Sequence, residues 1–226
     1  MNSNDLVPII FIAGFIVLMA FIIAASVRAA RKRTLELTTT AQQIGFEFLG
    51  NTWSGPAVSP RHRISILQRV RGKCLNAMTG ASGALQISLF DYTYRVGKST
   101  TTQTLAAFSQ NVELPPFALR PENFLDRIGD AILHNDLDFG SNPEFSRRYL
   151  LRSPDETNTR RLFTPGLMTY LEQTPSNWNI EGTGATLILY RGGSPVNPSD
   201  LPAFLEETSR IARTFFSSEG LRKSGG

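Results

Sequence analysis

The residues most often used in catalysis are few and scattered in this chain. It has one cysteine, Cys74, and two histidines, His62 and His134. A single cysteine excludes an internal disulfide framework and a thiolate-rich metal site, and two histidines leave few ways to form a Ser-His-Asp relay. Ser82 does not form a nucleophile elbow, because Ala84 stands where G-x-S-x-G needs its second glycine. The sequence therefore predicts no catalytic residue, no metal site and no cofactor.

Two short motifs come close to ligand-binding patterns but fail on spacing. Residues 97–100 (GKST) match the end of a phosphate-binding loop, but the first glycine of that pattern falls on Tyr92, and β-prone residues follow instead of a helix. Asp136 and Asp138 suggest a calcium loop, yet Gly140 comes one position too early for an EF-hand. A hairpin turn and a solvated acidic turn explain the two segments better.

Polar side chains gather in a predicted hairpin over residues 84–109. Together with one arginine further along, they are candidates for lining a pocket or contacting a partner: Asp91, Tyr92, Tyr94, Lys98, Gln103 and Arg120. The same residues would equally suit the paired polar face of a sheet. None of them is therefore assigned a catalytic role.

A basic run without acidic residues precedes this hairpin. Its members are Arg61, Arg63, Arg69, Arg71 and Lys73. On a strand, several of them would share one face and could meet headgroups, nucleic acid or an acidic partner. The alternative is an edge strand that positive charge protects against pairing with another chain. No aromatic residues alternate with the basic ones, so stacking on single-stranded nucleic acid is not supported.

The first segment predicts where the protein is located. Residues 6–27 contain no charged residue, and a helix of that length, about 33 Å, crosses a hydrocarbon core of about 30 Å. Four basic residues follow it: Arg28, Arg31, Lys32 and Arg33. The residues before it include Asp5 but no lysine or arginine, so an uncleaved anchor fits better than a signal peptide. The positive-inside rule then predicts a single-pass protein with its N-terminus outside and its domain in the cytoplasm.

The overall charge agrees with this membrane assignment. The chain has 23 basic and 19 acidic residues, a net charge of +4 and a pI near 9.5. The excess equals the four basic residues after the apolar segment, so the pI does not support a nucleic-acid-binding protein. With 41% hydrophobic residues the chain is also too apolar for intrinsic disorder. The predicted partners are the lipid bilayer and other subunits of a membrane complex, without nucleic acid.

The rest of the pattern predicts an α+β domain with a largely antiparallel sheet and packed helices. Strands are expected at 63–70 and in hairpins at 84–109 and 178–191, and helices at 121–133, from 165, and at 199–216. Apolar alternation in the first hairpin changes phase between Leu89 and Phe90, which indicates a β-bulge or a strand that changes sheet face. The predicted segments are a tail (1–5), a transmembrane helix (6–27), a basic juxtamembrane helix (28–45), the soluble domain (46–217) and a flexible tail (218–226).

Several phrases of the sequence resemble a known family. They are LFDYTYRVGK…TQTLAAF, LPPFALRPENFLDRIG, DLDFGSNPEFSRRYLLRSPDE, LFTPGLMTYL and WNIEGTGATLILYR. The chain resembles, from about residue 30 to 216, a widespread family of uncharacterised bacterial proteins with one N-terminal span and a cytoplasmic domain of unknown function. The resemblance implies a domain anchored in the bacterial inner membrane, and it carries no catalytic residues over.

Three functions remain open on these grounds. The first is a non-catalytic interaction or accessory subunit that docks on a larger membrane assembly. The second is a ligand- or lipid-sensing domain, which needs a cavity with converging polar groups. The third is a membrane-tethered hydrolase or transferase, which needs carboxylates with perturbed pKa values in a cleft.

Overall fold

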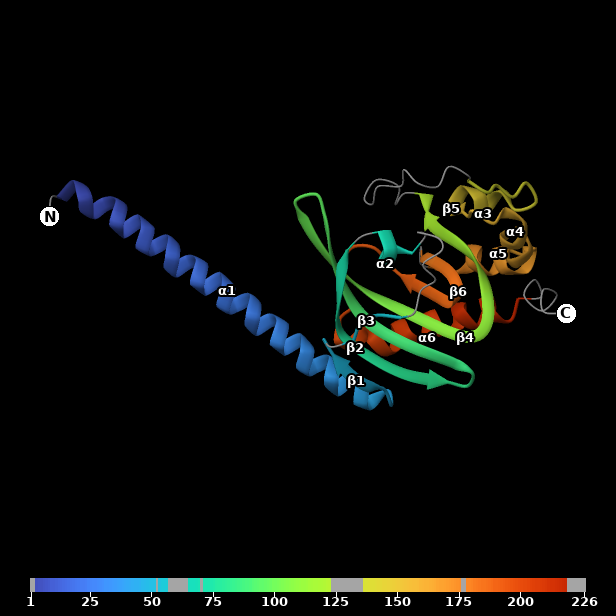
Figure 1. Cartoon of the computed structure of the whole chain (residues 1–226), viewed down its shortest axis with the longest axis horizontal. Helices are drawn as coiled ribbons and strands as arrows, with labels where there is room; N and C mark the ends of the chain where they lie inside the picture. Colours follow the sequence, from blue (N-terminus) through green and yellow to red (C-terminus); the bar gives the residue numbers. More distant parts are fainter. Residues whose placement is uncertain are drawn as a thin grey trace.

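The computed structural model describes residues 3–51, 53–56, 65–69, 71–122, 136–175 and 178–218. In chain order its elements are α1 (Ser3–Gln43), β1 (Glu47–Gly50), α2 (Ile66–Arg69), β2 (Gly72–Ser82), β3 (Leu85–Val96), β4 (Ser99–Pro121), α3 (Pro143–Arg148), β5 (Tyr149–Arg152), α4 (Glu156–Leu162), α5 (Pro165–Gln173), β6 (Asn179–Tyr190), the 3-10 helix η2 (Pro198–Asp200) and α6 (Leu201–Phe216). Figure 1 shows a long helix that extends away from a domain built on a sheet. This confirms the predicted α+β class.

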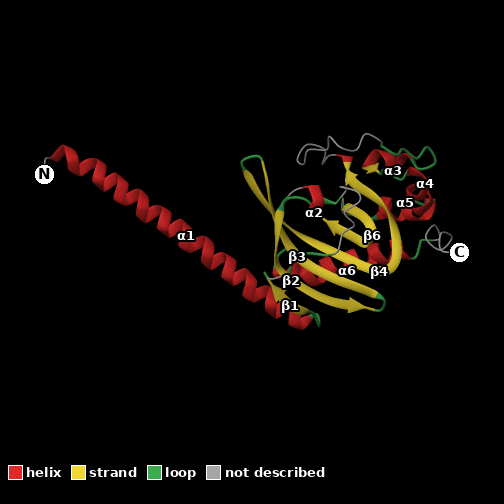
Figure 2. Cartoon of the chain, viewed as in Figure 1, coloured by secondary structure: helices red, strands yellow, loops and turns green. Residues whose placement is uncertain are grey.

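The sheet is antiparallel throughout and is organised around the long strand β4. The strand order is β1-β2-β3-β4-β5, and β6 also pairs with β4. The first part of β4 lies between β3 and β6, whereas its last residues pair with β5 where β3 has ended. Figure 2 shows the short helices α3, α4 and α5 gathered at the end of the sheet far from the tip of α1. One strand therefore connects the two ends of the domain.

Three local predictions need correction. Residues 179–190 form one strand, β6, which stays paired with β4 across two register shifts, and not two separate strands; β6 nevertheless bends sharply, with Gly184 at a φ of 57°, so that Glu181 reaches the Tyr190 hydroxyl at 2.8 Å. The hairpin predicted to end at residue 109 extends further, because β4 continues through Pro115 and Pro116 to Pro121, and these same shifts take up the irregular backbone around the prolines. Of the strand predicted at 63–70, the described residues 65–69 contain a helical turn over Ile66–Arg69 instead. The helix predicted at 121–133 lies almost wholly outside the described residues, and β4 extends to Pro121.

The change of phase in β3 reflects a change in which face of the sheet is covered. Its pairing with β4 is unbroken from Gln86 to Val96, so β3 itself has no bulge. Before Phe90 the buried apolar side chains of β3 share a core with α1 and α6, and from Phe90 onwards the buried apolar side chains share a core with Ile66 of α2. A bulge does occur opposite this point, in β2, where Asn76 adopts a left-handed conformation with φ of 51°. Each face of the sheet is thus covered along a different part of β3.

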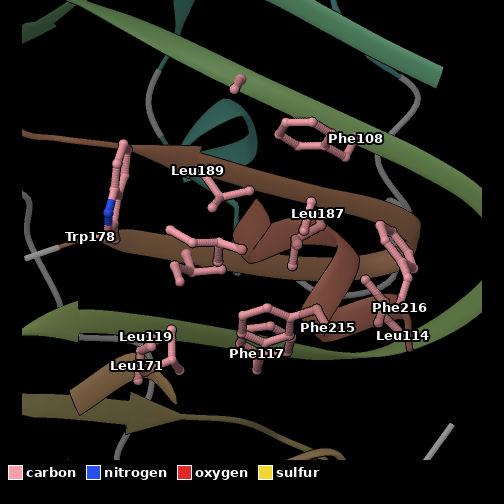
Figure 3. Close-up of a cluster of buried hydrophobic side chains, with 14 of the residues drawn as sticks. Phe108, Leu114, Phe117, Leu119, Leu171, Trp178, Leu187, Leu189, Phe215 and Phe216 are labelled. Carbon is pink, nitrogen blue, oxygen red and sulfur yellow. The ribbon is translucent and has the colours of Figure 1, made fainter. Parts of the chain in front are cut away.

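The larger core lies between the sheet and the C-terminal helices. The apolar stripe of the helix predicted at 199–216 faces this core: Leu201, Phe204, Ile211, Ala212 and Phe215 are buried in it, and Leu205 packs against it partly buried. Phe117 of β4 stacks on Phe215 with ring centroids 5.6 Å apart, and Phe163 meets both rings edge to face. Figure 3 shows Phe117 of β4 beside Phe215 of α6, with Leu187 and Leu189 of β6 in the same cluster. This core stabilises the packing of α6 against β4 and β6.

The helix α1 has two different parts. From Phe11 to Val27 its side chains are exposed, and this is the one helix in the described part of the chain that is long and apolar enough to cross a membrane, with a mean hydropathy of 2.3. Near its C-terminal end, Leu37 and Ala41 are buried against the domain. The helix runs without interruption from one part to the other. The exposed apolar segment of α1 is therefore continuous with the C-terminal segment of the same helix, which packs in the domain core.

Candidate functional site

The contact between α1 and the sheet is organised by a buried carboxylate, Asp91 of β3. Arg33 of α1 binds it with two nitrogens, Nε to Oδ2 at 2.8 Å and Nη2 to Oδ1 at 2.9 Å. Such a bidentate pair combines charge with a fixed geometry. Arg33 was predicted to be part of a membrane-flanking basic cluster, but its guanidinium is directed at the domain.

Two further side chains complete the hydrogen bonding of Asp91. Asn76 donates from Nδ2 to Oδ2 at 3.0 Å, and Thr104 donates from Oγ1 to Oδ1 at 2.8 Å. The bulge in β2 and the left-handed conformation of Asn76, which asparagine tolerates better than most residues, bring its amide to this position. Thr34 of α1 donates to the Asn76 amide oxygen at 2.8 Å. We call Arg33, Thr34, Asn76, Asp91 and Thr104 the anchor joint.

Apolar contacts fix the helix one turn further along. Leu37 and Ala41 pack in the same core as Phe46, which follows the turn at the end of α1. Gly45 makes that turn possible with a φ of 73°. Phe46 in turn lies so close to Gly80 of β2 that a Cβ there would be 2.4 Å from the ring. The end of α1 is therefore held by both polar and apolar contacts.

The opposite face of the sheet contains a second buried carboxylate, Glu181 of β6. It accepts hydrogen bonds from the Tyr190 hydroxyl at 2.8 Å, from the Ile66 amide at 2.6 Å and from Arg120 Nη2 at 3.2 Å. Burial raises the pKa of Glu181, and the Arg120 guanidinium opposes that rise. Burial and the neighbouring Glu181 also raise the pKa of Tyr190. We call Arg120, Glu181 and Tyr190 the inner cluster.

An open hollow of about 370 Å³ lies on this second face beside Trp53, Lys73, Cys74 and Tyr92. Burial raises the pKa of Cys74 to about 11 and that of Tyr92 to about 12, and the nearby Cys74 adds to the rise at Tyr92. Both groups are therefore protonated at neutral pH. Tyr92 lies directly over Gly72, where a Cβ would be 2.5 Å from its ring.

The structure separates the residues that were predicted to line one pocket. Tyr92, Tyr94, Gln103 and Arg120 share the face of the inner cluster, whereas Asp91 lies on the other face in the anchor joint. Gln103 is fully buried, and its amide has no hydrogen-bond partner among the described residues. Lys98 lies apart from all of them, exposed in the turn between β3 and β4. No single pocket therefore unites the predicted set.

The predicted basic residues also divide into groups. Arg28, Arg31 and Lys32 are exposed on α1, and Lys32 lies 3.7 Å from Glu36. Arg71 and Lys73 are exposed at the start of β2. Of the remaining residues of the basic run, Arg61 and Arg63 and the side chain of Arg69 lie outside the described part. The run does not form one strand, because α2 interrupts it.

Sequence reasoning missed the residues that complete both polar sites. Glu181 carried a usable signal, since it is a single acid inside the apolar strand pattern WNIEGTGATLILY. Asn76 and Thr104 carried none, because only the tertiary fold brings them to Asp91. Among the described residues, no group of three or more histidine, cysteine, aspartate or glutamate side chains is placed to hold a metal ion.

The fold and the anchor joint define a class: an antiparallel α+β domain fixed to the end of a long apolar helix. No protein-family model matches the chain, and no curated protein matches it. Among solved structures, the crystal structure of the mycobacterial trehalose monomycolate transport factor A, TtfA, has a similar fold. It aligns with a TM-score of 0.54 and 14% identity over 82% of this chain and 93% of that chain. At this identity the similarity shows the fold alone.

Proposed function

We propose that the protein is a membrane-anchored accessory subunit whose folded domain docks on a larger membrane assembly. The observation that carries the proposal is the anchor joint, in which Arg33 of the long helix binds Asp91 of the sheet through two hydrogen bonds. The domain is therefore held on its anchor and does not hang from a flexible linker.

A rigid connection has a functional consequence. A domain on a flexible tether samples many heights and orientations above a membrane. A domain joined to its transmembrane helix through Arg33, Leu37 and Ala41 presents the same surface at the same height. This fixed presentation suits docking against a partner that is itself embedded in the bilayer, because both partners then meet already oriented.

The similar structure supports the same class of function. TtfA is described as a transport factor, and we take from that description a role in support of transport. The apolar part of α1 in the present chain carries no charged residue between Phe11 and Val27, so it offers no pathway for ions or protons. We extend the accessory role, and not the transported substrate, to this protein.

The proposed location is the bacterial inner membrane, with a single span, the N-terminus outside and the domain in the cytoplasm. The exposed Arg28, Arg31 and Lys32 support this orientation through the positive-inside rule. Both buried carboxylates, Asp91 and Glu181, are engaged by donors of their own domain. Their engagement supports structural roles and a non-catalytic domain.

One observation favours a second candidate, a ligand- or lipid-sensing domain. The hollow beside Trp53, Cys74 and Tyr92 has a volume in the range of small-molecule sites. Its lining combines aromatic, hydroxyl and amine groups. If a ligand occupied it, the accessory domain would report that ligand to its membrane partner.

Crosslinking in native membranes tests the accessory role. The tagged full-length chain is crosslinked before gentle extraction, and the retained membrane proteins are identified. A variant with both joint charges removed, Arg33→Gln with Asp91→Asn, keeps hydrogen-bonding groups but loses the ionic connection; Arg31→Gln is the matched control on the exposed side of the helix. We expect a reproducible partner with the wild type and Arg31→Gln, and at least several-fold less with the double variant. A wild-type chain that remains a lone monomer contradicts the proposal.

A further inference from the structure

The end of the sheet beside the β3–β4 turn carries exposed positive charge without acidic neighbours in sequence. Exposed basic residues there are Arg71, Lys73, Arg95 and Lys98. Residues 48–112 include one acidic residue, Asp91. That carboxylate is already neutralised by Arg33 in the anchor joint. The positive charge at this end therefore has no acidic counterpart within the same stretch of chain.

Strand pairing brings these charges together. Gly72 pairs with Tyr94 and Lys73 with Thr93, so the start of β2 lies beside the last turn-proximal residues of β3. Arg95 pairs with Thr100 in the two-stranded ribbon that continues beyond Gly72, the first residue of β2. Ser99 and Thr100 add exposed hydroxyl groups. We call residues 93–100 the hairpin tip.

The anchor joint determines where the hairpin tip lies relative to the apolar helix. Asp91 is fixed to Arg33, and the six residues from Asp91 to the turn at Gly97 span about 20 Å of strand. From Arg33 back to Val27, the end of the apolar segment, is only about 9 Å of helix. In Figure 1 the hairpin extends further than any other part of the domain toward the N-terminal end of the molecule's long axis. The tip therefore reaches the level at which α1 leaves the bilayer.

We propose that the hairpin tip is a second membrane contact, which binds anionic phospholipid headgroups of the leaflet facing the domain. Basic side chains close to such a surface are attracted to it, and hydroxyl groups can donate to phosphate oxygens. The helix α1 and the tip then touch the membrane at two separated places. The anchor joint fixes the domain relative to α1, and a second contact with the membrane also fixes the tilt of this rigid unit relative to the bilayer.

Edge protection does not explain the whole cluster. Arg71 and Lys73 lie at the part of β2 that β1 does not cover, since β1 pairs only with residues 77–79. Positive charge there would discourage edge pairing. Arg95 and Lys98, however, belong to the ribbon tip beyond that edge, where only a short two-stranded piece is exposed. A contact with headgroups accounts for both pairs.

A single-label experiment on the full-length chain tests this contact. Ser99→Cys in a Cys74→Ser chain is labelled with a fluorescent donor, and the protein is placed in lipid nanodiscs with a headgroup-labelled acceptor lipid. One set of discs contains only phosphatidylcholine, and the other contains about 30% phosphatidylglycerol. We expect energy transfer to increase in the anionic discs and to fall back at high salt, because screening shortens the reach of surface charge.

Charge-reversal variants separate a local contact from net charge. Arg95→Glu with Lys98→Glu removes the contact. Each lost basic residue should lower the ratio of molecules whose hairpin tip touches the membrane to molecules whose tip does not by about fivefold. Arg147→Glu with Arg161→Glu makes the same charge change on α3 and α4, at the far end of the domain (Figure 1), and should keep the wild-type response. Equal transfer in both lipids, or an unchanged response in the tip variant, overturns the proposal. The discs contain only this chain and lipid, so a negative result leaves the docking proposal standing.

Discussion

The two buried carboxylates, Asp91 and Glu181, lie on opposite faces of one sheet and have different structural roles. The Asp91 side chain is 4% exposed, and its partner Arg33 is 23% exposed on a separate element, α1. The Glu181 side chain is 1% exposed, and its partner Arg120 is 3% exposed on a neighbouring strand of the same sheet. One pair joins the domain to its anchor at the edge of the fold, whereas the other lies inside the fold.

This difference predicts how each site fails. A fully buried ion pair that loses one partner leaves a charge in a medium that solvates it poorly. A pair at the edge can partly recover, because the remaining side chain reaches water. Damage to the inner cluster should therefore lower the stability of the whole domain, and damage to the anchor joint should mainly release α1.

The largest effect is expected for Glu181→Ala. The substitution removes the carboxylate from Arg120 and from the Tyr190 hydroxyl, both of which stay buried. We expect the free energy of unfolding to fall by about 3 to 5 kcal/mol, measured by urea titration in detergent with the fluorescence of the buried Trp178. Glu181→Gln, which keeps the shape and an acceptor oxygen, should lose clearly less. Equal losses for the two variants would contradict this expectation and would assign the whole effect to the negative charge of Glu181, which both variants remove.

A smaller and more local effect is expected for Asp91→Ala. Arg33 can turn toward water, so the loss of stability should be about 2 kcal/mol, typical of hydrogen bonds to a charged group. Hydrogen exchange at the amides of residues 33–43 should accelerate more than in Glu181→Ala, even though the global stability falls less. If instead Glu181→Ala releases these amides more strongly, the two carboxylates do not have separate tasks.

Two glycines extend the comparison to packing. A Cβ at Gly182 would lie 2.2 Å from the ring of Phe117, which Phe163 and Phe215 confine. At Gly80 it would meet the ring of Phe46, which is 9% exposed and can move outward. Gly182→Ala should therefore cost about 1 to 3 kcal/mol, and Gly80→Ala should cost less while loosening the end of α1. The same urea titration and hydrogen exchange check both, and a larger cost at Gly80 would contradict this reasoning.

The sequence predicts helices and strands better than it predicts the tertiary contacts between them. The stripe on α6 and the hairpin of β3 and β4 follow from local periodicity, and both are confirmed. The continuation of β4 through Pro115 and Pro116 was missed, because tertiary pairing with β6 outweighs the local preference of proline. Asp91 was selected as a polar residue of interest, but its partner Arg33 lies 58 residues away and was assigned to the membrane flank. A basic residue after an apolar helix can serve the membrane or the domain, and only the fold decides between them.

The smallest effect concerns Cys74, on the same face as the inner cluster but beside the open hollow. Burial raises its pKa from 9.0 to about 11, so the folded chain keeps the thiol proton at a pH where the unfolded chain loses it. This contribution to stability is complete below pH 9 and is lost as the pH rises through about 11. At pH 8 the thiolate form of Cys74 is scarcer than that of an exposed thiol, but each thiolate is more nucleophilic because its pKa is higher. Alkylation of Cys74 by iodoacetamide should therefore be about tenfold slower than alkylation of an exposed thiol. The control is Ser99→Cys in a Cys74→Ser chain. Equal alkylation rates at Cys74 and at the control cysteine would show that water reaches this face of the sheet well beyond the hollow. The difference in burial between the inner cluster and the anchor joint would then be smaller than the comparison assumes.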